Sequence, residues 1–256
     1  MGGAGEDFRR HSRVNQPVGT QRMTHSMNTS DSGRNPSPAP AEAVARLARL
    51  DCCAVSDALD KLKLGGVVSG LPQLSGAGRI AGRAVTMRLG TGAPPPGPVR
   101  HLGTTAIEAA KVGDIIVVEQ KSGVEAGCWG GILTLGAQLR GVAGVVADGP
   151  VRDIDEAKAY GFAIFARSCT ARTARGRIVE LATNQPVEIG DVLVSAGDYV
   201  IADGSAVIFV LPEHIERVLQ AAETIVAREA AMAGALRAGQ PITEVMGANY
   251  EHMLKA

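Results

Sequence analysis

The chain has 256 residues, 45% of them hydrophobic, and its 26 basic residues balance 26 acidic ones. Zero net charge argues against a nucleic-acid binder that relies on an overall basic surface, and 3% aromatic residues leave little for stacking on single strands. No apolar run approaches the roughly 20 residues of a membrane helix. The four cysteines form no CxxC pair, so a reducing, cytoplasmic compartment is expected, with neither nucleic acid nor membrane as a partner.

Hydrophobic periodicity divides the chain into three regions. Residues 1–40 are rich in Ser, Asn, Gly, Pro and Arg and carry too little apolar surface to offset the entropy of ordering. This segment is therefore predicted to be a disordered N-terminal tail. Residues 41–236 carry the periodic pattern and are predicted to form one α/β domain, whereas residues 237–256 are predicted to be a peripheral C-terminal tail.

In chain order, the domain begins with helical spacing and then alternates strands with helices. Helices are predicted over 41–50 and 54–62, a strand over 79–89, and a loop over 90–101 because three consecutive prolines lie there. The middle is predicted as helix 104–111, strand 114–119, helix 130–140, strand 142–147, helix 152–161 and strand 162–166. The last part is predicted as strands within 177–182, 187–203 and 206–212, followed by a long amphipathic helix to about residue 236.

A dense cluster of charged residues follows the strand at 142–147, in the sequence ADGPVRDIDE. The helix at 130–140 spans roughly 16 Å and the strand about 20 Å. With a short turn at Gly141 between them, the two run antiparallel, so the end of the strand returns to the start of the helix. Residues 148–153 are therefore expected beside Gly130 and Gly131.

The residues that meet there suit a small anionic ligand. The start of a helix presents free N–H groups, and two glycines let a ligand approach the backbone closely. Arg152 offers a planar fork for a carboxylate or an enolate oxygen, and Asp153 offers the hard oxygen that suits Mg²⁺ or Mn²⁺. The pattern predicts a pocket for a small, metal-chelating 2-oxo acid. Its predicted residues are Gly130, Gly131, Ile132, Leu133, Arg152 and Asp153.

Each of these residues also has an ordinary structural explanation. Asp153 in the first turn of a helix stabilises the helix dipole, and Arg152 among acids is typical of a solvated ion-pair face. Gly130-Gly131 is compatible with close packing alone, and Asp148-Gly149-Pro150 is typical of a turn. The combination of these residues, more than any one of them, carries the prediction.

Three further residues are weaker candidates. Schiff-base chemistry on a carbonyl substrate needs a buried lysine, and Lys111 and Lys121 flank the strand at 114–119. Both have polar or charged neighbours in the sequence, which favours solvated side chains. His101 follows the proline loop, where it is interpreted as an exposed loop residue, with a place in a lid as the alternative.

The stretch WGGIL…GVAGVVADGPVRDIDE resembles the RraA-like family, which includes class II 4-hydroxy-4-methyl-2-oxoglutarate aldolases and the regulator of ribonuclease E activity. The family pattern is a glycine, twenty residues, Arg-Asp, two residues and an acid, and Gly131, Arg152, Asp153 and Glu156 match it. The likeness extends from about residue 42 to 235. It implies a three-layer β/β/α swivelling-domain-like fold, assembled as homotrimers or hexamers.

The resemblance also implies roles for residues. The backbone of Gly130 to Leu133 would bind the substrate, Arg152 would contact it, and Asp153 would hold the divalent metal, with Arg152 and Asp153 as the catalytic pair. Aldolase members commonly carry an acid at the position of Gly131, so Gly131→Asp is expected to be tolerated. The implied activity is metal-dependent cleavage of a 4-hydroxy-2-oxo diacid to pyruvate, with oxaloacetate decarboxylation as a side activity. The alternative is a non-catalytic regulator that binds and inhibits a ribonuclease.

Overall fold

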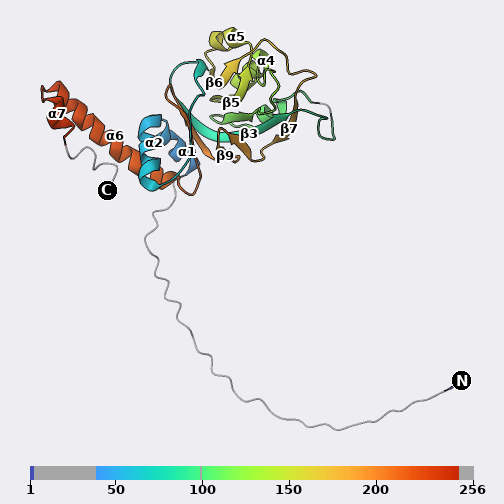
Figure 1. The fold of residues 1–256 in the computed structure, drawn as a ribbon, viewed down its shortest axis with the longest axis horizontal. Helices are drawn as coiled ribbons and strands as arrows, with labels where there is room; N and C mark the ends of the chain where they lie inside the picture. The colour runs from blue at the N-terminus through green and yellow to red at the C-terminus, as the bar shows by residue number, and fades with distance from the viewer. Residues whose placement is uncertain (3–38, 99, 248–256) are drawn as a thin grey trace. The chain divides into compact units, whose positions relative to one another are not determined.

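The computed structural model describes residues 1–2, 39–98 and 100–247. The predicted disordered tail lies almost wholly outside these residues. Within the compact unit Ser37–Ala256, strands and helices form a mixed α/β architecture, as the sequence predicts (Figure 1). The strands are β1 Val67–Val68, β2 Gln73–Ser75, β3 Ile80–Gly90, β4 Ile115–Glu119, β5 Gly144–Val151, β6 Ala163–Cys169, β7 Val179–Thr183, β8 Val187–Ile189, β9 Val192–Val194, β10 Tyr199–Ala202 and β11 Val207–Val210.

The long strand β3 joins two differently built parts of one sheet. Its first residues pair antiparallel with β10, which continues to β11 and β1. Its later residues pair parallel with β4, and β5 and β6 continue this parallel part until β2 closes it antiparallel. The strand β7 pairs with the end of β3, and β8 and β9 form a separate hairpin. Because β3 bends from one part into the other, the sheet folds over on itself.

Alternating side chains of the parallel part are buried on both faces, which explains the continuous apolar runs of β4 and β5. Ile116 and Val118 of β4 belong to the cluster under the helices, whereas Ile115 and Val117 belong to the cluster between the two parts of the sheet. Phe209 of β11 belongs to the same inner cluster from the other side. Two sheet parts packed face to face with helices outside confirm the predicted α/β fold, and the helices on β10 and β11 add a layer to the predicted β/β/α three.

Helices cover both outer faces of this sheet (Figure 1). One group packs on the parallel part and the other packs on β10 and β11. The first group is α3 Thr104–Ala109, α4 Gly131–Arg140 and α5 Ile154–Ala159, and the second is α1 Pro40–Leu47, α2 Cys52–Leu62 and the long α6 Ile215–Arg237. A short helix, α7 Ile242–Val245, follows in the segment predicted as peripheral. No helix of the described residues is both long and apolar enough to span a membrane.

The segment Asp148-Gly149-Pro150 is not a turn, which corrects the sequence prediction. It lies within β5, where the pairing with β6 is irregular between Ala147 and Pro150. Asp148 is buried and accepts hydrogen bonds from Arg167 Nε at 2.6 Å and from the backbone N–H of Gly190 at 2.7 Å. The carboxylate thus holds the β8–β9 hairpin to the sheet. Charge pairing, which local sequence does not show, lets these turn-forming residues continue the strand.

Candidate functional site

Three separate chain segments meet at the carboxyl ends of the parallel strands, joined by backbone hydrogen bonds. The Cys128 N–H donates to Pro150 O at 2.8 Å, and the Arg152 N–H donates to Trp129 O at 3.0 Å. The Gly127 N–H donates to Arg172 O at 2.9 Å, which adds the loop after β6. This arrangement confirms that the end of β5 returns to the start of α4. It also brings in a third segment that the sequence does not connect with the other two.

Glycines form the floor on which the charged side chains lie. A Cβ atom at Gly127 would fall 2.8 Å from Arg152 Cγ, and one at Gly130 would fall 2.8 Å from Asp153 Oδ2. A Cβ atom at Gly131 would fall 1.7 Å from Glu156 Oε2. Real Cβ atoms do not approach so closely, so the Arg152 stem and both carboxylates occupy space that any other residue would fill. The close-packing explanation of Gly130-Gly131 is therefore correct, and the packing partners are the proposed site residues themselves.

Asp153 connects the starts of two helices. It is the N-cap residue of α5, with a left-handed backbone (φ 58°), and its side chain makes no cap for that helix. Its Oδ2 instead accepts a hydrogen bond from the Gly131 N–H at 3.0 Å, which caps α4. Left-handed backbone is uncommon outside glycine, and Asp is among the residues that tolerate it best. The prediction that Asp153 lies inside the first turn of its helix is therefore wrong by one position, and this shift turns its carboxylate toward α4.

Arg152 lies against this carboxylate. Its Nε is 3.1 Å from both Oδ1 and Oδ2 of Asp153, and about a third of each side chain is exposed. The terminal Nη groups of Arg152 make no hydrogen bond with any described residue. Because only Nε is used, the outer edge of the guanidinium fork is free to bind an anion.

The first turn of α4 supplies further donors. The first intrahelical bond runs from the Thr134 N–H to Gly130 O at 2.9 Å, so the N–H groups of Ile132 and Leu133 have no partner within the helix. Trp129, 1% exposed, supports this turn because its Nε1 donates to Thr134 Oγ1 at 3.0 Å. Together with Arg152, these N–H groups line a cavity of about 290 Å³.

All six predicted site residues line this one cavity. Leu133 is a buried wall, as predicted, with 8% of its surface exposed. Ile132 is 83% exposed, so most of its side chain faces solvent. The glycines, Arg152 and Asp153 meet as the sequence analysis expects.

Seven other residues of this cavity were not among the predicted site residues, and two of them, Gly127 and Trp129, precede α4 directly. His101 and Leu102 come from the loop before α3, and Thr173, Ala174 and Arg175 come from the loop after β6. A usable signal was present in the sequence TARTARGR, because it directly follows a parallel strand, and the carboxyl ends of such strands share one edge of the sheet. His101 is therefore a cavity residue as well as an exposed loop residue; its Nδ1 lies 2.9 Å from Leu102 O.

Neither lysine suits Schiff-base chemistry. Lys121 Nζ lies 2.8 Å from Glu188 Oε1 and 3.7 Å from Asp148 Oδ2, so it belongs to an ion-pair network. Lys111 is exposed at the start of the turn before β4, as a solvated lysine should be. Neither residue lines the cavity.

The donor set at this cavity is compatible with a largely water-ligated Mg²⁺ or Mn²⁺. The described residues contain no cluster of three His, Cys, Asp or Glu that could enclose a metal, so a fully protein-ligated site does not fit them. The Asp153 carboxylate has about four lone-pair positions, and its bonds from the Gly131 N–H and Arg152 leave capacity for a cation. One hard carboxylate beside bare backbone suits a hard cation that keeps most of its water.

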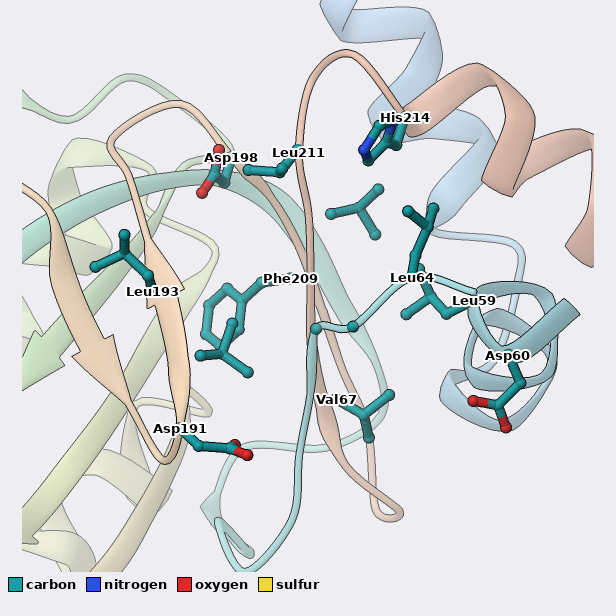
Figure 2. A pocket seen from close by; sticks show the side chains of 14 residues that line it. Leu59, Asp60, Leu64, Val67, Asp191, Leu193, Asp198, Phe209, Leu211 and His214 are labelled. Atoms are coloured by element: carbon teal, nitrogen blue, oxygen red, sulfur yellow. The ribbon is translucent and has the colours of Figure 1, made fainter. Parts of the chain in front are cut away.

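Larger cavities lie elsewhere. One of about 520 Å³ lies between α2, the β8–β9 hairpin and β11. Figure 2 shows its walls as Leu59, Val67, Leu193 and Phe209, with carboxylates and His214 spread around the edge. Asp198 is buried there and accepts a bond from the Ser195 N–H at 2.7 Å, so it serves a turn. The polar groups do not meet at one point, so this cavity offers no reaction centre.

Comparison with known proteins gives a family match. A model of the RraA-like family, described as Aldolase/RraA, matches residues 52–209, which include the three segments that meet at the cavity. A Halalkalibacterium halodurans protein named "Putative 4-hydroxy-4-methyl-2-oxoglutarate aldolase" is 31% identical over 174 residues, 66% of this chain and 76% of that protein. A protein of Methanocaldococcus jannaschii is 31% identical over 123 residues, and the match spans 58% of its length, less than two thirds.

Solved structures share the fold. A Pseudomonas syringae protein superposes with a TM-score of 0.72 at 25% identity, covering 82% of this chain and 99% of that one. Streptomyces coelicolor RraAS2, described as an unusual member of the RNase ES inhibitor RraA protein family, gives a TM-score of 0.66 at 24% identity, covering 77% of this chain and 98% of its own.

Proposed function

Because this chain belongs to the RraA-like family, we propose that it is a divalent-metal-dependent aldolase that cleaves 4-hydroxy-2-oxo diacids to pyruvate. The relatives named after 4-hydroxy-4-methyl-2-oxoglutarate point to that substrate type. The observation that carries the proposal is the meeting of Arg152, Asp153 and the unpaired N–H groups of α4 over a floor of glycines. Oxaloacetate decarboxylation follows as a side activity, since it passes through the same pyruvate enolate.

The hydrogen-bond donors of this chain would bind the two parts of the substrate that carry or develop negative charge. The N–H groups of Ile132 and Leu133, at the positive end of the α4 dipole, bind the carboxylate of the 2-oxo acid. The free edge of the Arg152 fork binds the 2-oxo oxygen and stabilises the negative charge that develops there when the C3–C4 bond breaks. The ion pair with Asp153 and the packing against Gly127 and Gly130 fix the Arg152 side chain before substrate arrives.

Asp153 would hold Mg²⁺ or Mn²⁺, which when bound supplies a Lewis acid for the same oxygen. Its backbone conformation and its bond to the Gly131 N–H already aim the carboxylate at the start of α4. The substrate carboxylate and the cation-binding carboxylate therefore share one helix terminus. Buried Leu133 and Trp129 exclude water from beneath it.

A ribonuclease-regulating role has less support. The solved structures described as RraA proteins are below 25% identity, and at that level the likeness extends to the fold alone. The residues over the glycine floor give a small-molecule substrate a specific place. Assembly into a homotrimer or hexamer stays a prediction of the family resemblance.

The proposal is tested by following pyruvate release from 4-hydroxy-4-methyl-2-oxoglutarate. We expect activity with Mg²⁺ or Mn²⁺, loss of it in a chelator, and recovery when either ion is added back. Borohydride trapping serves as a control, because it inactivates Schiff-base aldolases only. Full activity in chelator, or inactivation by borohydride, would overturn the proposal.

A further inference from the structure

A second cavity of about 730 Å³ adjoins the first, and the two share His101, Leu102, Ala174 and Arg175. We propose, on the basis of the aldolase function above, that this second cavity binds the half of the substrate beyond C4. In this arrangement Arg175 binds the distal carboxylate of the diacid.

Arg175 is the charged group placed at the boundary. It belongs to the loop after β6, which the Gly127–Arg172 backbone bond joins to the floor of the first cavity. Within the described part of the chain, Arg175 forms no ion pair. The nearby Arg172 differs, because its Nε lies 3.3 Å from Glu125 Oε2 and it lines neither cavity. A free guanidinium at the junction suits the distal carboxylate of a diacid that extends from the first cavity into the second.

Binding without turnover tests the carboxylate site. Titration calorimetry on the full chain with Mg²⁺ compares oxalate, which reaches only the first cavity, with 2-oxoglutarate, which carries the distal carboxylate. We expect Arg175→Gln to weaken 2-oxoglutarate binding about 10- to 100-fold, the range for losing a charged hydrogen bond, and to leave oxalate unchanged. Arg172→Gln is the matched control and should change neither. Equal weakening of both ligands by Arg175→Gln, or of neither, would overturn the assignment.

Turnover of 4-hydroxy-4-methyl-2-oxoglutarate separates this assignment from the aldolase function. If no diacid releases pyruvate, the aldolase function fails, and the calorimetric contrast alone decides whether Arg175 binds dicarboxylates.

Discussion

The small cavity at the start of α4 and the larger cavity under the β8–β9 hairpin differ in what meets inside them. At the small one, three chain segments bring a carboxylate, a guanidinium fork and free N–H groups onto bare glycine backbone. At the larger one, apolar walls separate the charged groups, and the buried carboxylate of Asp198 already serves a turn (Figure 2).

The meeting of polar groups at one point, rather than the volume of the cavity, therefore identifies the reaction site. Apolar walls can bind a ligand, but they do not stabilise charge that develops on it. An enolate that forms during the reaction needs hydrogen-bond donors that are already in position before the reaction begins. The glycines allow these groups to meet, because Arg152, Asp153 and Glu156 occupy the volume that side chains at 127, 130 and 131 would take. Variants in the two cavities should consequently separate activity from stability.

The largest difference is expected for matched aspartates. Asp153→Asn keeps an acceptor for the Gly131 N–H but loses the charge that would hold the cation, so kcat/KM for pyruvate release should fall about 1,000-fold. Asp191→Asn changes an exposed carboxylate of the larger cavity and should stay within twofold of wild type. Steady-state kinetics at saturating Mg²⁺ compares them. If Asp153→Asn kept more than a tenth of the wild-type activity, the small cavity would not be distinguished from the larger one as the reaction site.

A smaller but still large effect is expected for Arg152→Lys. Lysine keeps the positive charge but lacks the planar guanidinium group. In the wild type this group pairs with Asp153 through Nε, and its two Nη groups stay free for substrate. Transition-state stabilisation should fall by about 2–4 kcal/mol, in the range for removing one oxyanion donor. The loss should appear in both kcat and kcat/KM. A change confined to KM would show that Arg152 only binds the ground state.

Gly131→Asp is expected to have an intermediate effect, because Glu156 lies where the new side chain would enter. The family resemblance suggests that an acid is tolerated there, but the Cβ atom would fall 1.7 Å from Glu156 Oε2 and 3.3 Å from Asp153 Cβ. The exposed Glu156 side chain must swing away, and a further carboxylate then repels the substrate. We expect kcat/KM to fall about tenfold, since a like-charge contact costs on the order of 1 kcal/mol near a surface. Adding Glu156→Ala should restore most of it; no restoration would show that the backbone of α4 is itself disturbed.

The sequence was informative where local rules and the global fold agree. Helix and strand lengths alone place residues 148–153 beside Gly130 and Gly131, and the Gly131 N–H indeed donates to Asp153 Oδ2. Likewise, the apolar runs of β4 and β5 predict a sheet that is buried on both faces.

Tertiary partners account for what the sequence left out. Asp148-Gly149-Pro150 has turn chemistry, yet Arg167 and the Gly190 N–H hold it in a strand from positions far along the chain. Asp153 adopts a left-handed backbone that no pattern signals, because its carboxylate caps a different helix. Arg175 reaches the cavity through a loop whose position depends on the Gly127–Arg172 backbone bond. Each case rests on a contact between residues distant in sequence.

The smallest expected effect concerns Asp198 in the larger cavity, and it is one of stability alone. Burial raises the pKa of this carboxyl above its ordinary value of about 3.9, while the Ser195 N–H and Arg83 act in the opposite direction. The folded state therefore holds the proton more tightly than the unfolded state. Stability should fall as the pH rises from the ordinary pKa through the raised one.

Asp198→Asn removes this titration and keeps an acceptor for the Ser195 N–H. The Tm of wild type minus that of the variant should accordingly decrease between pH 4 and neutrality and then level off, as calorimetric melts at several pH values would show. Pyruvate release should be unchanged, because Asp198 lies in the larger cavity, where the polar groups do not meet at one point. A Tm difference that increases with pH would mean that Ser195 and Arg83 outweigh burial. A loss of activity at unchanged Tm would show instead that the larger cavity takes part in the reaction, and the contrast between the two regions would fail.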